Sequence, residues 1–97
     1  RPLGSAHPRH ADLLYPVNYG YIPDTVSGDG EELDVYLLGI EIPVEAYTGK
    51  IIGIIHRLDD VEDKLVAAPE GLTFNREEIT NAVRFQEQYY QTGVETL

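Results

Sequence analysis

The chain contains no cysteine, no methionine and no tryptophan in its 97 residues. Without cysteine, disulfide bonds, thiolate catalysis and thiolate metal sites are excluded. Basic residues are also scarce, because 7 Lys and Arg face 17 Asp and Glu and give a formal net charge of -10. A field of that sign repels nucleic-acid backbones and anionic membranes and attracts cations. No apolar run approaches the roughly 20 residues that span a bilayer, so we expect a soluble protein with no membrane partner. The absence of cysteine is compatible with the cytoplasmic location that we expect.

The remaining composition is that of a globular domain. Hydrophobic residues make up 42% of the chain and charged residues 25%, and the length predicts a single domain over residues 1–97. A core of this size is small, so a bound metal or a partner subunit would add stability. Because the chain starts at Arg1 and lacks Met, we expect its native start to lie upstream. Residues 1–5 partly resemble the remnant of a cleaved tag.

Hydrophobic patterning predicts a mainly β fold with one C-terminal helix. Residues 1–12, with their Pro, Gly and His, predict a loop. Strands are predicted over residues 13–22, where prolines interrupt the pattern, and over 33–40, 50–58 and 64–68. Asn75 followed by Glu78 is typical of a capping box, and it predicts a helix that runs to Tyr90.

Acidic residues gather in two short segments. The first holds Asp24, Asp29, Glu31, Glu32 and Asp34, and the second holds Asp59, Asp60, Glu62 and Asp63. Like charges at close range raise one another's pKa or recruit a cation, and hard oxygen ligands suit magnesium, manganese or calcium. Spacing alone leaves two interpretations open, a metal site or two solvated hairpin loops. The calcium helix–loop–helix pattern fits poorly, because Leu33 and Asp34 occupy its ligand and glycine positions.

Four motifs resemble those of the family I soluble inorganic pyrophosphatases. They are Tyr15-Pro-Val-Asn-Tyr-Gly-Tyr21, Asp29-Gly-Glu-Glu-Leu-Asp-Val35, Lys64-Leu-Val-Ala-Ala-Pro69, and the pair Phe85 and Tyr89 on the predicted helix. They occur in family order over residues 15–90. The resemblance implies an α+β fold that is mainly β, namely a small, twisted, OB-like β-barrel with a C-terminal helix. It also implies that the chain forms a homo-oligomer.

The resemblance assigns metal-binding and catalytic roles to the acids. Asp29 and Asp34 would ligate metal, with Asp34 bridging two ions, and Glu31 would stand at the position of the water-activating aspartate. Asp59 would be the first acid of a later metal loop. The second acid of that loop stays open, because Glu62 keeps the spacing to Lys64 whereas Asp63 keeps the residue type. Mg²⁺ is the implied cofactor, with Mn²⁺ as the alternative.

Substrate contacts follow from the same resemblance. Tyr19, Lys64 and Tyr89 would bind phosphate oxygens. The family arginine before the signature corresponds to Arg1 or Arg9, because an insertion, His7-Pro8-Arg9-His10, intervenes. The implied reaction is the hydrolysis of inorganic pyrophosphate to two phosphates by metal-activated water, so the chain is expected to be an inorganic diphosphatase.

Three departures from the family keep alternatives open. Glu31 is one methylene longer than the family aspartate, Tyr90 replaces a family lysine, and a family N-terminal region that supplies an acid and a lysine has no counterpart. One alternative is a degenerate pyrophosphatase-like module that binds metal or phosphate without turnover. Another is a hydrolase of a different phosphate ester or anhydride.

Overall fold

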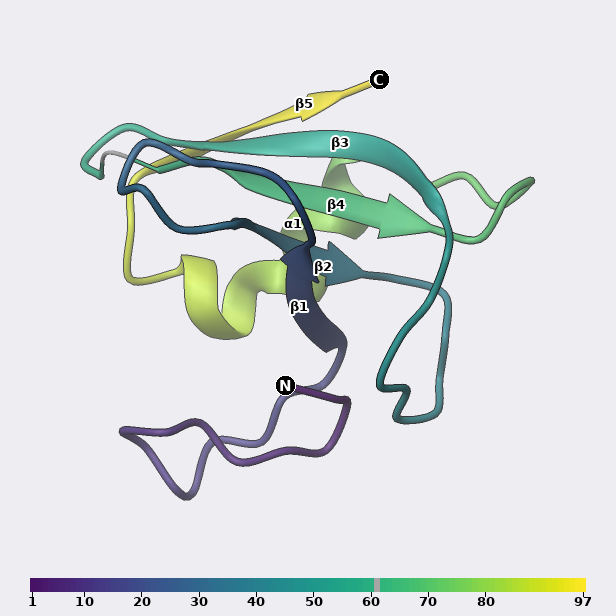
Figure 1. The fold of residues 1–97 in the computed structure, drawn as a ribbon, viewed down its shortest axis with the longest axis horizontal. Coiled ribbons are helices and arrows are strands. Elements are labelled where there is room, and N and C mark those ends of the chain that lie inside the picture. Colours follow the sequence, from purple (N-terminus) through teal and green to yellow (C-terminus); the bar gives the residue numbers. More distant parts are fainter. Residues whose placement is uncertain (61) are drawn as a thin grey trace.

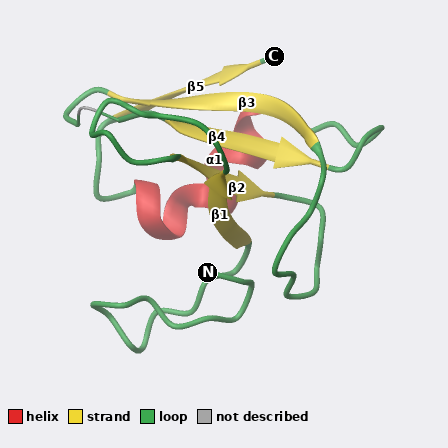
Figure 2. Ribbon diagram, in the orientation of Figure 1, coloured by secondary structure: helices red, strands yellow, loops and turns green. Residues whose placement is uncertain are grey.

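A single mixed sheet with one helix against it forms the core of the protein (Figure 1). The computed structural model describes residues 1–60 and 62–97. Its elements, in chain order, are β1 (Asn18–Ile22), β2 (Leu33–Leu37), β3 (Lys50–Arg57), β4 (Lys64–Ala68), α1 (Arg76–Glu87) and β5 (Thr92–Thr96). The irregular connection between β2 and β3 loops away from the sheet (Figure 2).

The described strands are ordered β1-β2-β4-β3-β5 across the sheet. The central pair β2 and β4 is parallel, with Val35 opposite Leu65, and the other three neighbouring pairs are antiparallel. The prediction of a mainly β fold with a C-terminal helix is confirmed. In the described part of the chain the sheet stays open rather than closing into a barrel, because β1 and β5 form its two edges and pair with different strands.

Helix α1 begins where the sequence predicts. The side chain of Asn75 accepts a hydrogen bond from the Glu78 amide, and the Glu78 carboxylate accepts one from the Asn75 amide, which completes the capping box. The helix ends at Glu87, three residues before the predicted end at Tyr90. No helix in residues 1–60 and 62–97 is long and apolar enough to cross a membrane.

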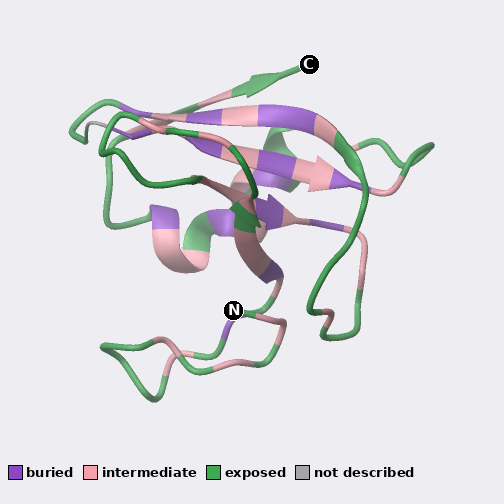
Figure 3. Cartoon of the chain, viewed as in Figure 1, coloured by how far each residue is buried: buried purple, intermediate pink, exposed green. Residues whose placement is uncertain are grey.

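The core lies between α1 and the central strands. Tyr36 of β2, Ile55 of β3, Val66 of β4 and Ile79 of α1 are each fully buried, and Val83 lies one helical turn beyond Ile79. Figure 3 shows that burial is concentrated on these elements, whereas the N-terminal loop is mostly exposed. One face of the sheet is therefore covered by the helix, and polar residues on this face are enclosed with it.

Three predicted strand boundaries and one element differ from the structure. The first strand begins at Asn18 rather than residue 13, and β2 ends at Leu37 rather than residue 40. The third strand ends at Arg57, one residue before its predicted end. The residues before β1 form a loop closed by a bridge between Ala6 and Leu14. Strand β5 was not predicted, because its sequence Thr-Gly-Val-Glu-Thr has little apolar character and its stability comes from pairing with β3.

Candidate functional site

Four predicted site residues meet on the helix-facing side of the sheet. The Lys64 ammonium donates hydrogen bonds to Oδ2 of Asp34, at 2.6 Å, and to Oε1 of Glu62. The Tyr19 hydroxyl donates to the same Asp34 oxygen at 3.0 Å. Lys64 and Glu62 are buried, with relative exposures of 4% and 7%. We call these four residues, with Asp29, the acidic cluster.

Strand register brings these side chains together. Tyr19 lies opposite Tyr36, which is two residues from Asp34 on β2, so all three side chains point to the same face. Lys64 begins β4, which pairs in parallel with β2. Glu62 precedes Lys64 by two positions and therefore emerges on the same side as the lysine. Segments distant in the sequence thus form one polar site.

The acidic cluster changes the proton affinity of its members. Burial lowers the pKa of Lys64, but hydrogen bonds to Asp34 and Glu62 outweigh it and raise that pKa above its usual value. Burial and the negative charge of Asp34 raise the pKa of Tyr19. Burial and a hydrogen bond with Asp29 raise the pKa of Glu62 to about 6. The lysine is therefore held in its charged form as the counter-ion of the cluster.

Asp29 and Glu31 lie at the exposed edge of the acidic cluster. Oδ1 of Asp29 accepts hydrogen bonds from the Ser27 hydroxyl at 2.5 Å and from the Glu31 amide at 2.9 Å. A hydrogen bond with Glu62, together with those from Ser27 and Glu31, lowers the pKa of Asp29 to about 2. Asp29 is thus ionised and linked to Glu62. The Glu31 residue is exposed.

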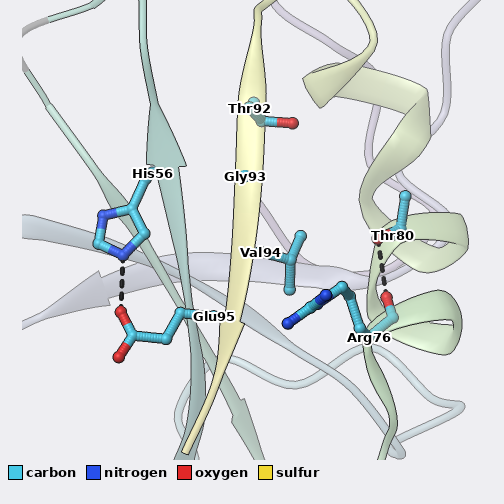
Figure 4. Close-up of a pocket in the computed structure, with 7 residues that line it drawn as sticks. All are labelled: His56, Arg76, Thr80, Thr92, Gly93, Val94 and Glu95. Atoms are coloured by element: carbon cyan, nitrogen blue, oxygen red, sulfur yellow. Dashed lines mark hydrogen bonds and ion pairs between the residues drawn. The ribbon is translucent and has the colours of Figure 1, made fainter.

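Asp63 points away from the acidic cluster. As the neighbour of Lys64 it emerges on the opposite face of the sheet, where its Oδ2 lies 2.9 Å from Nδ1 of His56. Nε2 of His56 lies 2.8 Å from Oε1 of Glu95, so the imidazole is held between two carboxylates. His56 and Glu95 line a cavity of about 500 Å³ (Figure 4), and Arg76 from α1 lies on the other side of β5.

Among the remaining predicted residues, Arg1 contacts Tyr19 through backbone groups, and Asp59, Tyr89 and Arg9 are exposed. Asp59 is exposed and accepts a hydrogen bond from the Gln91 amide at 3.2 Å, and Tyr89 is 69% exposed. The amino group of Arg1 donates to the Tyr19 carbonyl at 2.7 Å, and Arg1 lines a separate cavity of about 630 Å³. Arg9 is exposed, and its amide donates to Nδ1 of His7.

A buried network beside the acidic cluster was missed by the sequence analysis. The guanidinium of Arg57 donates to both carboxylate oxygens of Glu87, at 2.9 and 2.6 Å. The Tyr36 hydroxyl donates to Glu87 at 2.5 Å and accepts from Gln86 at 2.7 Å. One signal was present in the sequence: Glu87 follows Ile79 and Val83 at a spacing of four, so it extends the buried face of the helix.

The donor set of the acidic cluster fits a hard divalent cation. Asp29, Asp34 and Glu62 supply carboxylate oxygens, and the Lys64 ammonium already places a positive charge between two of them. Over residues 1–60 and 62–97, no three His, Cys, Asp or Glu side chains are grouped closely enough to hold a metal ion as they stand.

Proteins that resemble this chain in sequence or in fold are described as inorganic pyrophosphatases. The family model described as inorganic pyrophosphatase matches residues 5–93. The inorganic pyrophosphatase of Saccharolobus solfataricus is 38% identical over 68 residues, which cover 66% of this chain and 40% of that protein. The inorganic pyrophosphatase of Haemophilus influenzae is 44% identical over 61 residues, covering 56% of this chain and 33% of that one.

Solved structures agree with the sequence comparison. The crystal structure of an inorganic pyrophosphatase from Neisseria gonorrhoeae aligns with a TM-score of 0.61 and 27% identity, over 91% of this chain and 68% of that one. The one from Ehrlichia chaffeensis gives a TM-score of 0.66 at 24% identity, over 87% and 63%, a likeness of fold alone. The chain spans between 33% and 47% of the length of the first three curated relatives.

Proposed function

The chain belongs to the inorganic pyrophosphatase family, and we propose that it hydrolyses inorganic pyrophosphate to two phosphate ions in the presence of Mg²⁺. The observation that supports this proposal is the convergence of Tyr19, Asp34 and Lys64 with Glu62 on one face of the sheet. Tyr19, Asp34 and Lys64 come from three of the four motifs that resemble the family. These contacts support the proposal, because they bring carboxylates that could bind a cation next to groups that could donate to phosphate.

We assign metal binding to Asp29, Asp34 and Glu62. For the second metal ligand of the later loop we choose Glu62 over Asp63, because Asp63 is paired with His56 on the other face. Asp59 is the outer candidate ligand, since its exposed carboxylate lies on the same loop. When bound, Mg²⁺ supplies charge neutralisation of the phosphates and lowers the pKa of a coordinated water. Mn²⁺ is expected to substitute, because both ions favour carboxylate oxygens.

The protein's own groups bind and orient the substrate. Lys64 is charged and carries three donors, so it can turn from Asp34 toward a phosphate oxygen. Tyr19 keeps its proton, because burial and the charge of Asp34 raise its pKa, and it therefore acts as a hydrogen-bond donor. Glu31 is the candidate group that accepts a proton from the attacking water. Tyr89, Arg1 and Arg9 are peripheral candidates for binding phosphate.

Location and assembly belong to the same proposal. The net charge of -10 argues against nucleic acid as a partner and favours metal and a phosphorylated small molecule. A homo-oligomer in the cytoplasm is expected, as for the family. Several large apolar side chains are exposed, among them Leu58, Leu97 and Val26, and they are available for contacts between subunits.

A second candidate is a module that binds metal or phosphate without turnover. The observation in its favour is that Tyr89 is 69% exposed and that Tyr90, which replaces a family lysine, has its ring 3.7 Å from Cζ of Arg57. In this case Mg²⁺ raises the thermal stability through binding to the folded state, whereas phosphate release stays at background. A related candidate hydrolyses another phosphate ester or anhydride at the same site.

Phosphate release from pyrophosphate with Mg²⁺ tests the proposal. Asp34→Asn removes a charge that contacts both Lys64 and Tyr19, so it should reduce turnover by about 100-fold or more. Asp12→Asn, at an exposed position in the N-terminal loop, is the matched control and should retain wild-type turnover. Equal background rates in all three proteins would favour the non-catalytic module. Turnover of a nucleotide or phosphoester in preference to pyrophosphate would support the related hydrolase.

A further inference from the structure

Arg57 occupies an unusual position for a charged residue. It is the last residue of β3, Leu58 separates it from the acidic loop (Asp59, Asp60, Glu62 and Asp63), and it is 8% exposed. Burial acts to lower its pKa, while the hydrogen bonds and charge of Glu87 raise it. An ion pair enclosed in this way stabilises a fold little compared with apolar side chains of similar volume, because desolvation offsets the attraction. The contacts of Arg57 are therefore explained better by the geometry that they fix than by stability.

The contacts of Arg57 connect three parts of the molecule. Nε and Nη2 donate to the two oxygens of Glu87 at the end of α1, Nη1 donates to Oδ2 of Asp60 at 3.2 Å, and the guanidinium stacks on Tyr90 at 3.7 Å. The amide of Arg57 donates to Oδ1 of Asp63 at 3.2 Å. One residue therefore ties the acidic loop to the end of the helix that precedes Tyr89.

The chemistry requires arginine rather than any cation. A guanidinium has five donors in a planar fork, so it can bind a carboxylate with two of them, reach a second carboxylate and stack on an aromatic ring at once. A lysine ammonium at the same place has no fork and no planar face. Glu87 is itself fixed by the Tyr36 hydroxyl at 2.5 Å, so the anchor point does not turn with the loop.

Neighbouring hydrogen bonds fix the same junction. The Leu58 amide donates to the Gln91 carbonyl at 2.7 Å, and the Gln91 amide donates to Oδ1 of Asp59 at 3.2 Å. These contacts lie on the exposed side of the loop, whereas the Arg57 contacts lie on its buried side. The candidate ligand Asp59 follows Arg57 by two residues, and Glu62 lies on the same loop.

We propose that Arg57 is a positioning residue: through Glu87, Asp60 and Tyr90 it holds the acidic loop, and with it Asp59 and Glu62, in the arrangement that binds divalent metal. This inference rests on the proposed function, because it assigns Arg57 to the same site. Arg57 itself touches neither metal nor substrate.

Replacing Arg57 and Glu87 together by neutral residues separates the positioning role from any effect on stability. In Arg57→Met/Glu87→Gln the buried charges are removed together, and the glutamine oxygen can still accept from Tyr36, so we expect a folded protein with a Tm near that of wild type. Calorimetry with Mg²⁺ should nevertheless show a Kd raised about 10- to 100-fold, as for loss of groups that orient metal ligands. Arg57→Lys should show the same loss although it keeps the charge.

Arg84→Met is the matched control, since Arg84 is an exposed arginine of α1, the helix that carries Glu87. This variant should keep the wild-type Kd. A double variant with the wild-type Tm and an unchanged Mg²⁺ Kd would overturn the proposal, and so would Arg57→Lys with wild-type affinity. If the double variant unfolds, Arg57→Lys decides on the same measurement.

A failure of the proposed function can be distinguished from a failure of the proposal for Arg57. Absence of phosphate release by the wild-type protein would reject the hydrolase, and the Kd comparison would still judge Arg57. If the wild-type protein binds no Mg²⁺ either, the positioning role of Arg57 in a metal site is rejected as well.

Discussion

The Lys64 ammonium lies 2.6 Å from Oδ2 of Asp34 and also contacts Glu62, so a positive charge of the protein sits between two carboxylates of its own candidate metal site. The same lysine is the candidate phosphate ligand. Metal and lysine therefore compete for the carboxylates, and metal binding would free the ammonium for the substrate. This relationship links the two binding events.

The competition predicts opposite effects of one substitution. Lys64→Met removes a charge at ion-pair distance, so the affinity for Mg²⁺ should rise on the order of tenfold, because like-charge repulsion is lost. Phosphate release should fall by about 100-fold, since the substrate loses a charged donor. Calorimetry and a phosphate assay measure the two effects. Lys64→Arg keeps the charge and should not raise the affinity, and a weaker Mg²⁺ affinity in Lys64→Met would contradict the competition.

Metal should stabilise the folded protein through the acidic cluster. A ligand at about 100 times its Kd adds about 2.7 kcal/mol to the free energy of unfolding, which in a domain of this length shifts Tm by about 10–20 °C. Thermal unfolding with and without Mg²⁺ measures this shift. Asp34→Asn should lose most of it, whereas Asp12→Asn should keep it. A wild-type Tm that does not respond to Mg²⁺ would argue that the acids are solvated loops.

The pair of carboxylates around His56 predicts a pH-dependent contribution to stability. Hydrogen bonds to Glu95 and Asp63 raise the pKa of His56 above its usual value of 6.5. The stabilising contribution is therefore complete below about pH 6.5 and is lost as the pH rises through the higher pKa of the folded state. The Tm difference between wild type and His56→Gln should shrink over this range. Thr48→Ser, at an exposed position without a titratable side chain, should show no such trend.

The buried face of α1 predicts a large loss on truncation. Ile79 faces the sheet and is fully buried, and its Cδ1 lies close to Gly53. Ile79→Ala should lower the free energy of unfolding by about 2–5 kcal/mol, through lost burial and a remaining cavity. Urea unfolding monitored by tyrosine fluorescence measures this change. The half-buried neighbour Thr80→Ala, which loses a hydrogen bond to the Arg76 carbonyl, should change it far less.

Local patterns in the sequence carried much of the fold. The Asn75 capping box marked the start of α1, and the β-branched run of β3 marked a strand, because both signals are short-range. The strand β5 escaped prediction, since its edge position is set by pairing with β3 and not by its own residues. The strand order, with β2 beside β4, likewise depends on contacts between distant segments.

The candidate site, like the fold, was predicted from the sequence only in part. The motifs identified Asp34, Lys64 and Tyr19, and register brought them together. Whether Glu62 or Asp63 faces this cluster could not be read from the sequence, because the two residues are adjacent and emerge on opposite faces. Arg57 was missed because its significance lies in a partner thirty residues later, Glu87.

The parallel pairing of β2 with β4 has a consequence for folding. Asp34 and Lys64 meet across this pair, and parallel strands cannot join through a tight turn, so their contact forms after a long loop closes. A partly folded chain that holds the β1–β2 or β3–β4 hairpin alone would lack the assembled cluster. Metal would then bind late and slow unfolding while leaving the refolding rate nearly unchanged, so its presence would lengthen the lifetime of the native state.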